Sequence, residues 1–171
     1  MAIYVLKLGH RIHRDYRLDT HLALAARAFL ADKLYYTGTP DKEFENRINK
    51  VSTRFGGFFN LEYLDNFKTL TKSFKGKIIH LTMYGKELNE EINEIAKSEN
   101  VLIIVGGEKV QPEIYEIADY NIAIKNQPHS EVSALAIFLE KYCSIRNIKD
   151  KFKNAAFQII GSEKGKKVVK S

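Results

Sequence analysis

The sequence has little of what builds disulfide-bonded or membrane proteins. Its single cysteine, Cys143, excludes an internal disulfide and a cysteine-rich metal site. It has no apolar run of 18 residues and no secretory signal pattern, so neither a membrane span nor export is expected. These absences fit a reducing compartment, and we predict a cytoplasmic protein.

Two nucleotide-binding motifs are also missing. No Gly-Lys-Ser or Gly-Lys-Thr occurs, which excludes a P-loop. The first predicted strand is followed by Gly9-His10-Arg11 and not by Gly-x-Gly-x-x-Gly, which argues against a dinucleotide-dependent oxidoreductase. His10 and His13 have the spacing of a metal-binding pair, but the arginines beside them repel a cation. We therefore predict no metal site.

Basic residues are in excess. The 171 residues include 27 Lys and Arg and 21 Asp and Glu, a net charge of +6. This favours a polyanionic partner, although a solvated lysine-rich surface is the alternative. Length and composition suit one globular domain with a real core. We predict one domain over residues 1–171, with a tail from about 149 to 171 that packs as a helix or hairpin extension.

Short apolar segments alternate with amphipathic ones along the chain. Strands are expected at Ala2–Leu8, Lys33–Thr37, Phe58–Leu64, Lys77–Thr82, Val101–Val105 and Asn121–Ile124. Helices are expected between them, so the pattern predicts an α/β fold with a mostly parallel sheet and helices on both faces. Ala156–Ile160 and Lys166–Val169 are expected to close the tail as a hairpin.

Three residue patterns mark the starts of helices. Thr20 or Asp19 is expected to cap a helix over His21–Leu30. Thr39-Pro40-Asp41 is expected to start the next helix, with proline at its first position. Ser130 is expected to cap the helix that carries Val132 and Leu135 on its apolar side.

Small or polar residues follow three of the predicted strands. These loops begin at Leu81, at Gly106-Gly107 and at Ile124. Carboxyl ends of parallel strands meet at one edge of a sheet, where open α/β sheets bind ligands. Paired glycines also allow a ligand to approach the backbone closely. The three loops therefore predict one binding cleft; well-capped crossover loops without a ligand are the alternative.

Arginines recur just after the first strand. Arg11, Arg14 and Arg17 can clamp successive phosphates of a nucleic acid, and Tyr16 between them offers a stacking face. A solvated basic loop is the alternative. Arg27 lies in an apolar helix and either snorkels to the surface or faces the cleft.

Three further side chains have contrasting expectations. His80 lies in an apolar strand, where we expect a hydrogen-bonded core residue. His129, in the cleft loop, is the better candidate for ligand contact. Cys143 lies on the apolar face of its helix, where we expect a core residue.

Several motifs lie in an order that resembles one known family. They are Leu8-Gly9-His10-Arg11, Arg14-Asp15-x-Arg17, Thr20-His21, Ala26-Arg27-Ala28-Phe29, His80-Leu81-Thr82-Met83-Tyr84-Gly85, Ile103-Ile104-Val105-Gly106-x-Glu108-Lys109-Val110 and Asn126-Gln127-Pro128-His129-Ser130-Glu131-Val132. The chain resembles the archaeal tRNA cytidine-56 2′-O-methyltransferases of the SPOUT superfamily. The resemblance implies a C-terminal trefoil knot, a homodimer, and transfer of a methyl group from S-adenosylmethionine to a T-loop ribose of tRNA.

The resemblance also assigns site residues. It implies that three loops hold S-adenosylmethionine: Leu81; Gly106, Gly107, Glu108, Lys109 and Val110; and Ile124, Lys125, Asn126, Gln127, Pro128, His129, Ser130 and Glu131. Arg17 and Glu108 are the candidate catalytic residues. Contacts to RNA are expected from Arg11, Arg14, Arg17, His21 and Arg27.

Two other readings stay open, an RNA-binding module of this fold without catalysis and methylation of a different tRNA ribose. Lys125 and Leu30 both stand where the family usually has glycine, and we expect the backbone at Lys125 to be either strained or differently bent.

Overall fold

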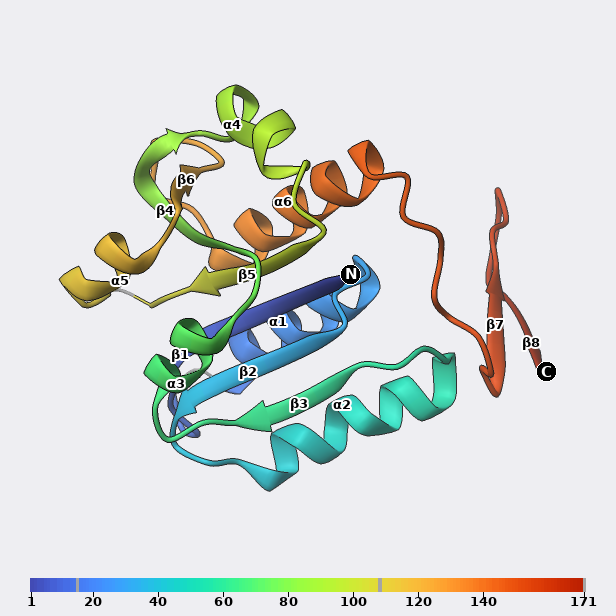
Figure 1. The fold of residues 1–171 in the computed structure, drawn as a ribbon. Helices are drawn as coiled ribbons and strands as arrows, with labels where there is room; N and C mark the ends of the chain where they lie inside the picture. Colours follow the sequence, from blue (N-terminus) through green and yellow to red (C-terminus); the bar gives the residue numbers. More distant parts are fainter. Residues whose placement is uncertain (15, 108, 171) are drawn as a thin grey trace.

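A six-stranded parallel sheet forms the centre of the computed structural model, which describes residues 1–14, 16–107 and 109–170. The strand order is β3-β2-β1-β5-β4-β6, and every neighbouring pair is parallel. The strands are β1 (Ala2–His10), β2 (Lys33–Gly38), β3 (Asn60–Tyr63), β4 (Lys77–Glu87), β5 (Asn100–Val105) and β6 (Tyr120–Ala123). The predicted mostly parallel sheet is thereby confirmed (Figure 1).

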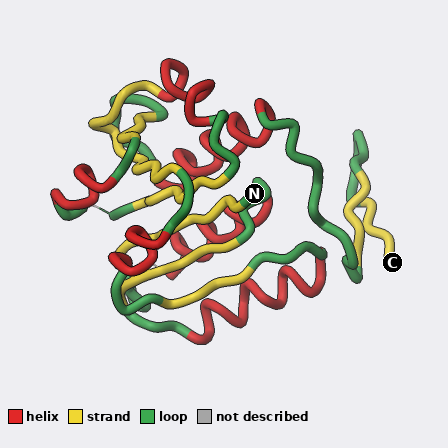
Figure 2. The backbone as a smooth tube through the Cα atoms, in the orientation of Figure 1, coloured by secondary structure: helices red, strands yellow, loops and turns green. Residues whose placement is uncertain are grey.

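Helices cover both faces of this sheet, as predicted (Figure 2). On one face lie α1 (Tyr16–Ala28), α2 (Lys42–Phe55), α4 (Leu88–Ile95) and α6 (Glu131–Ile145). The shorter α3 (Phe67–Ser73) and α5 (Pro112–Ile117) pack on the other. Alternation along β5 explains the two cores: Ile103 packs into the first cluster, whereas Leu102 and Ile104 pack into the second.

The helix starts differ in part from those predicted. Helix α1 includes Tyr16, so Asp19 lies inside its first turn, where its buried carboxylate binds His10 instead of capping a helix. Asp41 is the N-cap of α2 and accepts a hydrogen bond from the Phe44 amide, so Pro40 precedes the cap. Ser130 caps α6 as predicted, accepting from Val132.

Strands β4 and β6 pair with an irregularity that the sequence does not indicate. Ile122 of β6 pairs with Leu81 and also with Lys86 of β4, so the register shifts and residues 82–85 lie between these two pairings. A Cβ added to Gly85 would lie 2.3 Å from the backbone oxygen of Asn121. The two segments are therefore packed backbone against backbone, and β4 continues past the predicted end at Thr82.

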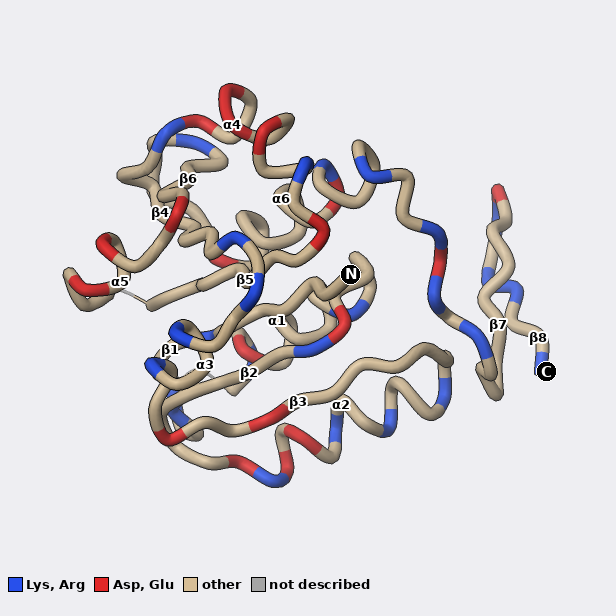
Figure 3. Tube along the Cα trace, in the orientation of Figure 1, with Lys and Arg blue, Asp and Glu red and all other residues tan. Residues whose placement is uncertain are grey.

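The tail ends in the expected hairpin. Strands β7 (Phe157–Ile160) and β8 (Lys167–Lys170) pair antiparallel beyond the end of α2, where the Arg54 guanidinium lies 5.1 Å from the Phe157 ring centroid (Figure 1). Lys and Arg positions recur along the segment that leads to the hairpin and within it (Figure 3). Over the part of the chain that the structure describes, no helix has the length and apolar character needed to cross a membrane.

Backbone strain lies at Leu30, the second position where the family usually has glycine. Among described non-glycine residues, positive φ occurs at Leu30 (70°), Asn147 and Asn154, so Lys125 carries no such strain. Of the two alternatives for Lys125, the strained backbone is therefore wrong. Leu30 follows the end of α1 and adopts a left-handed conformation that favours glycine.

Candidate active site

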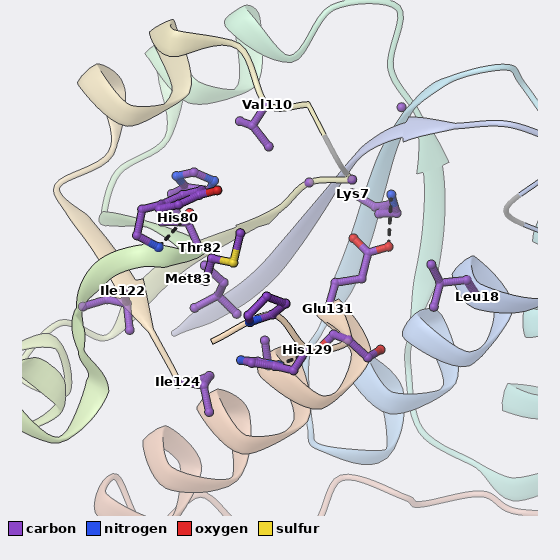
Figure 4. Close-up of a pocket in the computed structure, with 18 of the residues that line it drawn as sticks. Lys7, Leu18, His80, Thr82, Met83, Val110, Ile122, Ile124, His129 and Glu131 are labelled. Atoms are coloured by element: carbon purple, nitrogen blue, oxygen red, sulfur yellow. Dashed lines mark hydrogen bonds and ion pairs between the residues drawn. The ribbon is translucent and has the colours of Figure 1, made fainter. Parts of the chain in front are cut away.

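A cavity of about 660 Å³ opens at the carboxyl ends of β4, β5 and β6 (Figure 4). The three predicted loops converge on it. Among the predicted cofactor residues, its lining includes Leu81, Gly106, Gly107, Val110, Ile124, Gln127, Pro128, His129, Ser130 and Glu131. Leu18 of α1 and Lys7 of β1 complete the wall on the side of the N-terminal segment. One hollow is therefore built from segments far apart in the sequence.

Apolar side chains and a buried histidine shape this cavity. Leu81, Ile122 and Ala134 are buried in its wall. His80 is fully buried; its Nδ1 lies 2.8 Å from Asn121 Oδ1, whereas Nε2 has no hydrogen-bond partner. Burial lowers the pKa of His80, which favours the neutral ring. A ligand with an apolar ring system and a polar edge, such as adenine, fits these residues.

The paired glycines differ in their surroundings. A Cβ on Gly106 would lie 2.2 Å from Val110 Cγ2, so a larger residue would collide with the loop. A Cβ on Gly107 would meet nothing within 4 Å. The first glycine therefore allows the loop to fold tightly, and the second leaves room at the cavity mouth. Glu108, a predicted catalytic and cofactor residue, lies outside the described residues.

The other predicted cofactor residues lie around this cavity. The Asn126 side-chain amide donates to the backbone oxygens of Met83 and Gly85, and so fastens the last loop to β4. Lys125 is exposed beside it. Lys109 lines a second hollow of about 980 Å³.

Arg11 and Arg14 line both hollows. Lys68 also lines the second hollow, which therefore has several basic side chains in its wall. Arg17 and His21 are exposed on α1; Arg17 directly precedes Leu18, which lines the first cavity. The structure therefore brings two of the predicted RNA-binding arginines to the cavity itself, whereas Arg17 and His21 are not part of its lining.

Arg27 is used inside the molecule. Its side chain is 8% exposed, its Nη2 donates to the Gly56 carbonyl at 2.5 Å, and its guanidinium lies 4.8 Å from the Phe152 ring centroid. Of the two alternatives for Arg27, surface and cleft, neither matches this position. The predicted contact with RNA thus gains no support from its surroundings.

A chain of buried charges runs beneath the arginine segment. His10 Nδ1 lies 2.6 Å from Asp19 Oδ2, and His10 Nε2 lies 3.3 Å from Asp41 Oδ2. Lys7 Nζ lies 3.6 Å from both Asp19 Oδ1 and Glu131 Oε1. The side chains of this buried charge network are between 0% (Asp19) and 15% (Glu131) exposed. Positive and negative groups alternate, so each charge has an opposite neighbour.

Two residues of this buried charge network have shifted pKa values. Burial opposes the charged form of His10, but hydrogen bonds to Asp19 and Asp41 outweigh it and raise the pKa of His10. Burial likewise opposes the charge on Asp41, yet hydrogen bonds from the Phe44 amide and His10 lower the pKa of Asp41. The network therefore favours an imidazolium between two carboxylates.

Sequence reasoning missed this network. His10 was considered only as a metal ligand, and Lys7, Asp19 and Asp41 were given no role in the site. The available signal was Lys7, a lone cation within the apolar strand Ala2–Leu8. Within the described residues, no group of three or more His, Cys, Asp or Glu side chains could hold a metal ion.

The remaining candidates agree with their expected environments. Cys143 is buried, as predicted, and burial raises the pKa of its thiol to about 11, so it is a core residue and not a nucleophile. His129 is exposed at the cavity, with Nδ1 3.1 Å from the Ser130 oxygen and 3.2 Å from Ser133 Oγ.

Comparison with known proteins identifies relatives of the whole chain. The model of the family described as tRNA ribose 2′-O-methyltransferase, aTrm56, matches residues 55–169. The tRNA (cytidine(56)-2′-O)-methyltransferase of Methanocaldococcus jannaschii is 45% identical over 99% of this chain and 97% of that protein. That of Pyrococcus horikoshii is 46% identical, covering 98% of this chain and 84% of the relative.

A solved structure shares the fold. The SpoU methyltransferase AviRb from Streptomyces viridochromogenes, in complex with the cofactor AdoMet, superposes with a TM-score of 0.64 at 11% identity. The match covers 87% of this chain and 59% of that one. At this identity the likeness shows the fold alone, whereas the family match and the near-full-length relatives carry the assignment. The chain belongs to the archaeal tRNA ribose 2′-O-methyltransferase family.

Proposed function

We propose that this protein methylates the 2′-hydroxyl of cytidine 56 in the T-loop of tRNA, with S-adenosylmethionine as the methyl donor. The near-full-length identity to relatives named for this reaction carries the proposal. The cavity at the ends of β4, β5 and β6, with Arg11 and Arg14 at its edge, supplies a place for both reactants. When bound, S-adenosylmethionine supplies a methyl group activated on a sulfonium sulfur.

The three loops hold the cofactor. Leu81, Ile122 and Ile124 provide apolar contacts for its base, and the neutral His80 ring offers Nε2 as an acceptor. Gly106 and Gly107 let the backbone approach it closely. The loop residues Lys109, Lys125 and Asn126 complete the proposed cofactor set, with Asn126 acting as the fastener of the last loop.

The arginine segment places the RNA. Arg11 and Arg14 contact phosphates beside the target ribose, and His21 and Arg17 extend this surface along α1. Arg17 polarises or orients the ribose, and Glu108 orients the ribose or cofactor. Holding the reactants in line contributes most of the acceleration in such transfers.

The assembly belongs to the same proposal. We propose one domain over residues 1–171, a trefoil knot formed where β4 and β6 pair irregularly, and a homodimer in the cytoplasm. Ile137 and Ile145 on α6 are 42% and 49% exposed, and Ile159 on the hairpin is 71% exposed, which supports burial by a second copy. Sedimentation of the full chain tests this: a dimer is expected, and a monomer at micromolar concentration contradicts it.

Methyl transfer is tested with labelled S-adenosylmethionine and an unmodified tRNA transcript, followed by mapping of the modified nucleotide. Label at ribose 56 is expected. Label at another ribose supports the alternative target, and binding of tRNA without cofactor binding in calorimetry supports a non-catalytic RNA-binding module. Replacing cytidine 56 by deoxycytidine is the matched substrate control, since it removes only the acceptor hydroxyl.

Arg17→Ala tests the proposed catalytic arginine. Methylation should fall by about 100-fold or more while the Kd for the cofactor stays within twofold, because the side chain acts on the ribose. Lys50→Ala removes an exposed cation on α2 and serves as the control. Unchanged turnover in Arg17→Ala removes Arg17 from this role.

A further inference from the structure

Lys7 and Glu131 form an ion pair in the wall of the cavity, opposite in character to its apolar residues Leu81 and Ile122. Lys7 Nζ lies 3.6 Å from Glu131 Oε1, and the two side chains are 3% and 15% exposed. Figure 4 shows the two facing each other from β1 and from the start of α6. Both residues line the cavity, so the pair meets whatever is bound there.

The position of Glu131 favours a fixed negative charge. It is the first residue of α6, directly after the Ser130 cap, where the positive end of the helix stabilises a carboxylate. The Lys7 ammonium stabilises the same carboxylate from the other side. Two separate sources of positive charge therefore stabilise the Glu131 carboxylate at the cavity wall.

Lys7 itself has no freedom to move. Its ammonium donates to the Leu8 carbonyl at 2.9 Å and lies 3.6 Å from Asp19 Oδ1. Asp19 is in turn held by His10. The buried network thus fixes Lys7, and Lys7 fixes Glu131.

The charge balance of the wall suggests what this carboxylate binds. Among the described residues that line the cavity, Glu131 supplies the acidic side chain, whereas Lys7, Arg11 and Arg14 are basic. A cationic ligand would be repelled by such a wall unless the carboxylate faced it. The methyl donor is cationic at sulfur, and its demethylated product, S-adenosylhomocysteine, carries a neutral thioether there.

We propose that Glu131, positioned by Lys7, recognises the sulfonium charge and makes the cavity prefer the methyl donor over its product. The inference rests on the function proposed above. Methyl transfer breaks the sulfur–carbon bond and leaves the electron pair on sulfur, so the positive charge is lost; the methyl group joins the ribose oxygen and the hydroxyl proton is released. The carboxylate then keeps Lys7 but loses its attraction to the ligand, which favours product release.

Calorimetry on the full chain tests the proposal with S-adenosylmethionine and S-adenosylhomocysteine as separate ligands. In Glu131→Gln the Kd for the donor is expected to rise about tenfold, and that for the product by less than about threefold. Glu140→Gln changes an exposed carboxylate on the same helix and should alter neither value. An equal loss for both ligands overturns the proposal, because a merely structural role of Glu131 affects them alike.

Lys7 is tested as a positioning residue by the same ratio. Lys7→Met should lower the preference for the donor as Glu131→Gln does, and Lys7→Arg should restore it. A folded Lys7→Met that keeps the wild-type ratio overturns the role of Lys7; if Lys7→Met fails to fold, Glu131→Gln decides. Wild-type protein that binds neither ligand overturns the proposed function as well, whereas binding of both with no change of ratio in Glu131→Gln overturns only this inference.

Discussion

The two halves of the sheet's carboxyl edge are built from different types of residue. At the ends of β4, β5 and β6, the walls are apolar side chains and backbone, as at Leu81, Ile122 and Gly106. At the end of β1, the interior is a line of alternating charges that includes Asp19 and His10. One half is shaped to enclose a ligand, and the other to hold a segment rigidly beneath the arginines.

The difference lies in how each half responds to change. An apolar wall loses a little contact when one side chain is altered, whereas a buried charge that loses its partner remains uncompensated. The stability of the ionic half therefore depends on each charged residue. The stability of the cavity half depends most on the close backbone packing of β4 against β6. The following substitutions test this contrast.

Asp19→Ala should have the largest effect. It leaves Lys7 and His10 buried without the carboxylate that joins them, at a cost of about 3–5 kcal/mol in the free energy of unfolding. Chemical denaturation followed by circular dichroism measures this loss. A loss below about 1 kcal/mol would mean that the chain of charges contributes little to stability.

Gly85→Ala should disrupt the other half through its backbone. The new Cβ would lie 2.3 Å from the Asn121 oxygen, so β4 or β6 must shift, at about 3 kcal/mol. Gly161→Ala is the matched control, because a Cβ there meets nothing within 4 Å. Equal unfolding midpoints for the two variants would show that the contact between β4 and β6 tolerates the added atom.

Raising the pH should weaken the ionic half by a smaller amount. The pKa of His10 is raised in the folded protein, so its contribution is fully present below its ordinary value of 6.5 and lost as pH rises through the folded-state pKa. The lowered pKa of Asp41 gives the opposite limit: its contribution is present above 3.8 and lost as pH falls through its folded-state pKa.

The contribution of His10 is isolated by comparing unfolding free energies of wild type and His10→Gln between pH 5 and 9. The difference between them should shrink as pH rises. His80 contributes a slope of opposite sign in both proteins, because its pKa is lowered, and so cancels. A difference that is constant with pH would mean that folding does not raise the pKa of His10.

Glu94→Gln should have the smallest effect. Glu94 and Lys97 pair at 2.5 Å on the surface, where solvent screens the charges and the side chains lose entropy on pairing. The midpoint of thermal unfolding should stay within experimental error of wild type. A marked decrease would show that surface pairs also matter, and would weaken the contrast with the buried network.

Local sequence patterns were sufficient for the strand ends and the helix cap of the cavity half. Val101–Val105 reads as a strand buried on both faces, and Ser130 as a helix cap, because each signal lies within a few residues. The loops at the strand ends followed from the parallel arrangement, and all three meet at one cavity.

Contacts between residues far apart in the sequence determine the features that local patterns could not reveal. Asp19 read as a helix cap, since nothing near it in sequence shows that His10 and Lys7 would reach its carboxylate. The register shift at residues 82–85 beside β6 was equally hidden, because periodicity describes which side of a strand is buried and not where its pairing becomes irregular. A strained or differently bent backbone was expected at Lys125, whereas the strain lies at Leu30, where the chain turns after α1.

Arg27 helps to hold residues 151–153 of the C-terminal tail, here called the strap, against the rest of the protein. It joins the Gly56 carbonyl to the Phe152 ring, while the Gly57 amide donates to the Lys153 carbonyl at 3.0 Å and Lys151 pairs with Asp32 at 2.7 Å. A protease that cuts the exposed bend around Gly161 would therefore release only the outer strand, and the strap would stay in place. Deleting residues 149–171 would instead uncover the Arg27 guanidinium, so the shortened chain should unfold more readily than the nicked one.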